Sequence, residues 1–201
     1  MNTIPPVGLD WIDGSGDCSD IVISTRVRLA RNLQGSRFGV QYTDKDREAV
    51  SIRVQAATRE HTSLEESVFL DLVSINRLQQ RILLEKRLVS TELIGEEESG
   101  PAKGSALILG PRDCSSIMVN EEDHLRIQTM FSGLQLKKAW SLADEMDEKL
   151  GDVLPFAYHN EFGFLTSCPT NVGSGLRASV LVHLPGLVLT NEIGKVLAGL
   201  G

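Results

Sequence analysis

The order of apolar and polar positions along the chain predicts strands and helices in mixed succession. Residues 20–29 are rich in β-branched side chains and alternate in polarity, which is typical of a half-buried strand. Two apolar runs flank Gly110-Pro111-Arg112-Asp113 and predict a hairpin, because glycine and proline favour a turn. We predict strands at residues 20–29, 67–74, 106–109, 116–119, 124–130, 163–167 and 176–183.

Helical spacing of apolar residues, together with end signals, predicts four helices. Thr43 and Asp46 resemble a capping box that opens a helix running to about residue 61. A second helical pattern covers residues 75–88, and a third, amphipathic pattern begins at Leu136 and ends at Gly151. After Pro185, an apolar helix is predicted to end near Gly199.

These elements predict an α+β domain with a mostly antiparallel sheet flanked by helices. Residues 1–19 have the composition of a loose lead-in, which leaves 20–201 as the domain. Residues 95–104 are predicted to be a solvated loop, and residues 168–175 cannot be regular because proline and glycine interrupt them. The sequence ends directly after a helix, where another strand is the natural next element, so we expect a domain truncated at its C-terminus.

Composition narrows the function classes. A length of 201 residues with 41% hydrophobic residues fits one globular domain. The net charge of −7 argues against nonspecific nucleic-acid binding. No apolar run approaches the roughly 18 residues that span a bilayer, and the N-terminus lacks the pattern of a signal peptide. We therefore expect a cytoplasmic protein that binds neither nucleic acid nor membrane.

The cations and potential metal ligands add two further points. Arginine outnumbers lysine 13 to 7, and arginine clusters suit a confined anion such as a nucleotide. The cysteines (Cys18, Cys114 and Cys168) and the histidines (His61, His124, His159 and His183) show no metal-ligand spacing. We expect no structural metal, and we expect most of the histidines to be structural or exposed.

Arg26 and Arg28 lie two positions apart in the first predicted strand, so their side chains share one face. Two adjacent guanidinium groups repel each other unless an anion lies between them, and phosphate accepts bidentate hydrogen bonds from each. The alternative is a pair of surface arginines that each bind a carboxylate.

An acidic turn, Asn120-Glu121-Glu122-Asp123, follows another strand. Its carboxylates are suited to holding a cationic substrate and accepting its proton, while nearby Arg126 is within reach of a phosphate. The alternative is a solvated acidic turn.

The loop Cys168-Pro169-Thr170-Asn171-Val172-Gly173-Ser174-Gly175 lets backbone approach a ligand closely, and Arg177 follows it. Gly173 to Ala178 also fits the pattern G-x-G-x-x-A, but that dinucleotide fingerprint must open a helix, and the residues after it favour a strand. We reject that reading. No Walker motif and no nucleophile elbow is present.

Three blocks together resemble the phosphagen kinase superfamily, and most closely the bacterial protein arginine kinases. They are STRVRLARN at 24–32, NEEDHLRIQ at 120–128 and LTSCPTNVGSGLRASVLVHLP at 165–185, with LLEKRLVS at 83–90 as a fourth. The resemblance covers nearly the whole chain from residue 20 onward.

The resemblance implies ATP and Mg²⁺ as cofactors and assigns site residues. Glu122 falls on the carboxylate that holds the substrate guanidinium, and Cys168 on the cysteine beside it, although an inert buried thiol remains an open alternative. Arg87 stands where the family commonly has a histidine near the adenine. The implied nucleotide-binding residues are Ser24, Thr25, Arg26, Val27, Arg28, Arg87, Arg126, Arg177, Ala178, Ser179, Val180 and Leu181.

The resemblance also implies partners and missing parts. The substrates would be proteins with exposed arginine, and an activator protein and Clp-type protease machinery are implied partners. The family's later R-G-x-Y-G-E segment and its C-terminal domain, through which a homodimer would form, are absent from this sequence. We therefore expect this piece to bind nucleotide weakly and to turn over little.

Only 23 residues precede Ser24, whereas small-molecule phosphagen kinases carry a longer helical domain there. The first hypothesis is accordingly a protein arginine kinase. A small-molecule guanidino kinase and an inactive nucleotide-binding or partner-binding fragment remain open.

Overall fold

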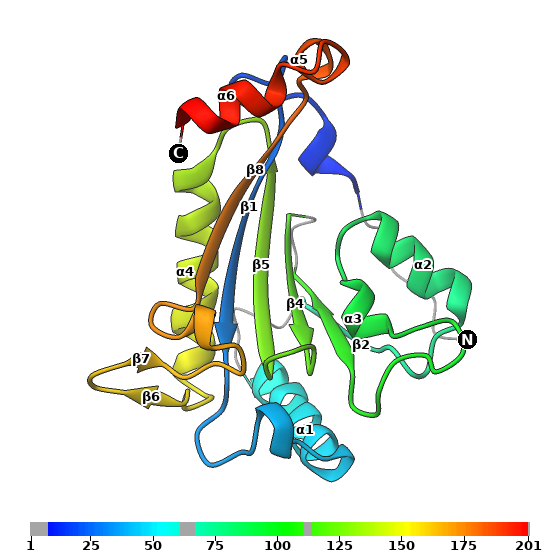
Figure 1. Cartoon of the computed structure of the whole chain (residues 1–201). Helices are drawn as coiled ribbons and strands as arrows, with labels where there is room; N and C mark the ends of the chain where they lie inside the picture. Colours follow the sequence, from blue (N-terminus) through cyan, green and yellow to red (C-terminus); the bar gives the residue numbers. More distant parts are fainter. Residues whose placement is uncertain (1–7, 61–66, 111–113, 201) are drawn as a thin grey trace.

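The computed structural model describes residues 8–60, 67–110 and 114–200 (Figure 1). Its main sheet has six strands in the order β2-β3-β4-β5-β1-β8, and all neighbouring strands are antiparallel. The strands are β1 (Val22–Arg31), β2 (Val68–Asp71), β3 (Ala106–Leu109), β4 (Ser115–Val119), β5 (Leu125–Ser132), β6 (Tyr158–His159), β7 (Gly163–Phe164) and β8 (Leu176–Val182). The α-helices are α1 (Asp44–Glu60), α2 (Arg77–Glu85), α3 (Thr91–Ile94), α4 (Leu136–Gly151), α5 (Pro185–Leu189) and α6 (Ile193–Leu200). The α+β class with an antiparallel sheet is confirmed.

The prediction of one helix after Pro185 is wrong. The segment forms α5 and α6, and Asn191 between them has a φ of 58°, a left-handed conformation that interrupts a helix. The sequence did not predict α3 or β6, because such short elements give little periodic signal, and the strand predicted at residues 163–167 forms only over β7, Gly163–Phe164. The expected turn residues 111–113 and the expected helix end at residue 61 lie outside the described residues.

The lead-in is less loose than its composition suggests. Residues Asp10–Ile12 form a 3-10 turn, and the Trp11 side chain is buried. The Leu134 N–H donates to the Asp17 carbonyl over 2.7 Å. The described part of this segment therefore packs against the end of the sheet.

The two faces of the sheet carry different cores. Helices α1 and α4 cover one face, where Val54 and Ala143 pack against strand residues such as Leu29 and Ile127. On the other face, α2 and α3 cover only the β2, β3 and β4 half, through residues such as Leu83 and Leu93. On the same face, the β5, β1 and β8 half presents polar and charged side chains, and the candidate site lies there.

Candidate functional site

Strand register brings distant arginines to one face of the sheet. Side chains directly opposite each other on antiparallel strands project to the same side. Arg28 of β1 lies opposite Arg177 of β8, and Arg26 lies opposite Ser179. On the other flank of β1, Ala30 lies opposite Arg126 of β5. The four arginines expected at the site thus share one face, although about 150 positions of sequence separate the first from the last.

Burial and the charges of neighbouring arginines both disfavour the charged form of two of these arginines. Burial lowers the pKa of Arg26, and the nearby charges of Arg87, Arg177 and Arg126 lower it further. Burial and the neighbouring arginines lower the pKa of Arg28 to about 10. Arg28 Nε is buried without a hydrogen-bond partner, and among the described residues Arg26 and Arg28 make no ion pair. Such a cluster of positive charge is suited to binding a polyanion.

Two hollows lie along this face. One, with a volume of about 170 Å³, contains the expected acceptor-side residues Glu122 and Cys168 beside three arginines. Its lining is Arg28, Ala30, Glu122, Arg126, Cys168, Thr170, Asn171, Gly175 and Arg177. The other, of about 150 Å³, is lined by Ser24, Arg26, Arg87, Met130, Ser179, Val180 and Leu181.

Four expected residues do not turn their side chains toward this face. Thr25 and Val27 alternate with the arginines along β1, so their side chains project to the α4 side, where both are buried. Ala178 lies opposite Val27 and Val180 lies opposite Thr25, so both side chains project the same way. Alternation along a strand sends neighbouring side chains to opposite faces, so these four residues would contact a nucleotide through their backbone, and their assignment as nucleotide-binding residues stays a prediction.

Arg87 reaches the cluster from the end of α2. Its φ is 59°, a left-handed conformation usually taken by glycine at this position after a helix. The Leu88 N–H donates to the Leu83 carbonyl, which closes the turn, and Gln128 donates to the Arg87 carbonyl over 2.7 Å. The Arg87 guanidinium lies 5.5 Å from the centre of the Trp11 ring. The sequence pattern missed Trp11, and a lone tryptophan in a glycine-rich lead-in offers little signal for it.

Arg126 is held by two carboxylates. Its Nη1 contacts Glu121 Oε1 at 2.5 Å, and its Nη2 lies 3.4 Å from Glu122 Oε2. The Glu121 side chain is fully buried and also accepts from the Ser90 hydroxyl, which caps α3. The sequence analysis did not single out Glu121; its position five residues before Arg126 was the available signal.

The acidic turn divides into three roles. Glu122 has a partly exposed side chain and borders the larger of the two arginine hollows. Asp123 is buried, and its Oδ1 accepts from Asn32 over 2.7 Å and from the Ser167 N–H over 2.6 Å. The three carboxylates of this turn therefore do not bind one substrate together, because Asp123 binds the loop before Cys168 instead.

Two residues named from the sequence have well-defined surroundings. His124 is buried, and its Nδ1 accepts from the Leu33 N–H while its Nε2 donates to the Arg37 carbonyl, so it is a structural histidine as expected. Burial lowers its pKa from 6.5. The Cys168 thiol is partly exposed and lies 3.0 Å from the Thr170 hydroxyl, so it is not fully buried.

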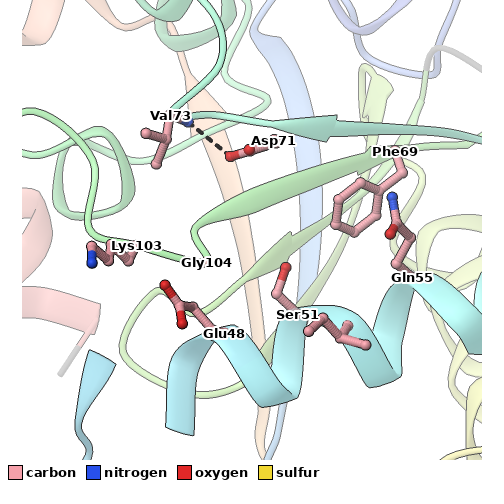
Figure 2. Close-up of a pocket in the computed structure, with 9 residues that line it drawn as sticks. Glu48, Ser51, Gln55, Phe69, Asp71, Val73, Lys103 and Gly104 are labelled. Atoms are coloured by element: carbon pink, nitrogen blue, oxygen red, sulfur yellow. Dashed lines mark hydrogen bonds between the residues drawn. The ribbon is translucent and has the colours of Figure 1, made fainter. Parts of the chain in front are cut away.

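A larger hollow of about 430 Å³ lies elsewhere, between α1 and the edge strand β2 (Figure 2). The α1 residues Glu48, Ser51 and Gln55 face Phe69 and Asp71 across it. Its volume is greater, yet it contains no arginine. Among the described residues no group of three metal-ligating side chains occurs, and no helix is long and apolar enough to cross a membrane. The arginine face is therefore the candidate site.

Comparison with known proteins identifies the family of this chain. The family model described as ATP:guanido phosphotransferase, C-terminal catalytic domain, matches residues 49–200. The chain is 42% identical over 194 residues to a protein named protein-arginine kinase from Desulforamulus reducens, covering 94% of this chain and 53% of that protein. Identity to the protein-arginine kinase of Moorella thermoacetica is 44% over 193 residues, covering 94% and 54%. The chain thus spans about half the length of the curated relatives it matches.

Solved structures share the fold. The substrate-free duplicated taurocyamine kinase from Schistosoma mansoni superposes with a TM-score of 0.72 at 25% identity, covering 92% of this chain and 28% of that chain. Lombricine kinase superposes with a TM-score of 0.73 at 22% identity, covering 92% and 54%.

Proposed function

The chain belongs to the ATP:guanido phosphotransferase family, and we propose that it supplies the nucleotide-binding and acceptor-orienting part of a protein arginine kinase. This enzyme would transfer the γ-phosphoryl group of ATP to the guanidinium group of protein arginine side chains. The observation that carries the proposal is the convergence of four arginines on one face of the sheet: Arg28, Arg126 and Arg177 line a hollow with Glu122, and Arg26 lines the neighbouring hollow.

The two hollows suggest how the substrates would lie. The triphosphate would lie along the arginine face, where fixed positive charges compensate the charge that spreads over the phosphoryl oxygens in the transition state. The nucleoside end would lie in the hollow with Arg87, whose guanidinium can stack on a base. The acceptor guanidinium would lie between Glu122 and Cys168 in the other hollow.

The transfer breaks the bond between the γ-phosphorus and the bridging oxygen, which leaves with its electron pair as ADP. A guanidinium nitrogen forms the new N–P bond and loses a proton. Because the guanidinium pKa exceeds about 12, this nitrogen needs an adjacent base. The Glu122 carboxylate would orient the acceptor and take that proton.

Mg²⁺ would enter as part of the MgATP substrate. The carboxylates nearest the arginines, Glu121 and Glu122, are engaged by Arg126, so the chain's own residues offer few ligands and the phosphates would hold the ion. Bound there, the ion would supply further positive charge to the phosphates.

Activator and Clp-type protease partners, a homodimer and a cytoplasmic location remain parts of the proposal.

One experiment separates the hypotheses. The chain and a longer form with the R-G-x-Y-G-E segment are incubated with MgATP and either an arginine-rich protein, free arginine or taurocyamine. Mass spectrometry under non-acidic conditions then detects phosphoguanidinium groups. Phosphorylated protein supports the proposal, whereas phosphorylation of the free compounds alone supports a small-molecule guanidino kinase.

Binding measurements complete the design. ATP affinity is determined by calorimetry for both forms in the same buffer. ATP binding without transfer by either form identifies a nucleotide-binding module instead of an enzyme. Absence of both binding and transfer contradicts the whole assignment. Transfer by the longer form alone agrees with the expectation that the shorter chain turns over little.

A further inference from the structure

Arg31 is a buried arginine on the opposite face of the sheet from the phosphate-binding candidates. Its side chain is only 3% exposed, and its guanidinium makes four N–H donations at once. Nε and Nη2 donate to Asp147 of α4, over 3.2 and 2.7 Å. Nη1 donates to the carbonyls of Ala30 and Ser174, over 2.8 and 2.9 Å. Arg31 therefore joins α4, the end of β1 and the loop before β8.

The hairpin of β6 and β7 adds a fourth element to this junction. The Arg31 guanidinium lies 3.6 Å from the centre of the Phe164 ring, a cation–π contact. Phe164 in turn exchanges two backbone hydrogen bonds with Gly173, of 2.8 and 3.2 Å. The loop that contains Cys168 is thereby fixed to β7 as well as to β1.

The backbone leaves no spare room at this junction. Gly175 has a φ of 63°, and a Cβ there would lie 2.6 Å from both the Ala30 carbonyl oxygen and Arg31 Nη1. The Ala30 N–H donates to the Gly175 carbonyl over 2.9 Å. Two residues later, Arg177 lies opposite Arg28 at the site.

We propose that Arg31 is a positioning residue that holds the loop of residues 168–175 against β1, so that Arg177 and Cys168 keep their places at the two ends of that loop. The roles of Arg177 and Cys168 at the site rest on the proposed function. The contacts by which Arg31 holds the loop do not depend on it. Arginine is required because only its planar fork of five donors reaches two carbonyls and a carboxylate together; lysine has three donors on one atom.

The decisive variant is Arg31→Lys, and Arg77→Lys is its matched control. Arg77 also donates to two main-chain carbonyls, those of Ile94 and Gly95, at 2.9 Å each, but it lies beside α3 and does not contact the loop. Arg77→Lys removes an arginine that binds main-chain carbonyls away from the loop, so it controls for a general effect of losing such contacts. Asp147→Asn is a milder second variant in case Arg31→Lys does not fold.

Two measurements on the ligand-free protein test whether Arg31 holds the loop. They are amide hydrogen exchange at Gly173 and Ala30 and the rate of Cys168 alkylation, each followed by mass spectrometry. We expect both rates to rise by about tenfold in Arg31→Lys through local opening of the loop, and to remain unchanged in Arg77→Lys. Equal rates in the two variants would overturn the proposal. Asp147→Asn should raise both rates by a smaller factor. Unchanged rates in Asp147→Asn would also contradict the proposal that Arg31 holds the loop.

ATP affinity provides a third readout that separates the two proposals. Arg31→Lys should bind ATP about tenfold more weakly than the wild-type chain, since a displaced Arg177 loses about one charge-assisted hydrogen bond. Wild-type affinity in a variant whose loop exchanges faster would contradict the role in positioning Arg177. Failure of the wild-type chain to bind ATP contradicts the proposed function and leaves the exchange and alkylation tests in force.

Discussion

Arg28→Met should stabilise the ligand-free chain while removing its affinity for ATP. Burial first, and then the charges of neighbouring arginines, lower the Arg28 pKa well below its usual value, to about 10. A shift of this size corresponds to about 3 kcal/mol against the charged form. The guanidinium is still partly exposed, and screening by solvent reduces the penalty to about 1–2 kcal/mol.

The sign of this effect follows from the direction of the shift. The folded-state pKa lies below the unfolded value, so the penalty is complete at any pH below about 10 and is relieved only as the pH rises toward 12.5. At neutral pH the substitution removes the penalty, and methionine retains much of the apolar stem. For a chain of this length we expect the melting temperature to rise by about 3–6 °C.

The assay is thermal unfolding with and without MgATP. ATP at about one hundred times its dissociation constant stabilises a protein by about 2.7 kcal/mol. The wild-type chain should show the corresponding rise in melting temperature, whereas Arg28→Met should show little of it. Arg53→Met is the control: Arg53 donates to the Ser36 hydroxyl over 2.8 Å outside the cluster, so this variant should lose slight stability and keep its response to ATP. A lower melting temperature in ligand-free Arg28→Met than in the wild type would refute the repulsion argument.

Three further predictions concern single residues. Gly175→Ala should lower the free energy of unfolding, measured by urea denaturation, by about 2 kcal/mol or more, because the φ of Gly175 is positive and a Cβ there would collide with the Ala30 carbonyl. Gly186→Ala is the control, since a Cβ at Gly186 meets no atom within 4 Å and should cause no comparable loss. Because burial lowers the pKa of His124 from 6.5, stability should be complete above about pH 6.5 and fall as the pH drops below it; unfolding curves of equal midpoint at pH 7.5 and 5.5 would contradict this. In the longer form, Glu122→Gln should reduce kcat for phosphoryl transfer by at least about a hundredfold with unchanged ATP affinity by calorimetry, and a parallel loss of ATP binding would move Glu122 into the nucleotide site.

Much of the local structure could be predicted from the chain itself. The two-residue period that identifies β1 also places Arg26 and Arg28 on one face, and Gly151 ends α4 where the pattern ended. The family blocks directed attention to Arg126, Arg177 and Glu122, which lie together in the structure. These inferences succeed because the direction of side chains along an element depends on local backbone geometry alone.

What lies next to each element was decided only by the tertiary structure. Which strands flank β1, and in what register, depends on long-range pairing, so the position of Arg177 of β8 opposite Arg28 of β1 has no local signature. The same holds for Glu121, whose burial against Arg126 distinguishes it from the partly exposed Glu122 beside it. Arg31 was part of a matched block, yet it lies on the opposite face from Arg28 and pairs with Asp147. The sequence determines which chemical group each side chain carries. Whether a charged group faces solvent, an opposite charge or a like charge depends on how distant segments pack around it.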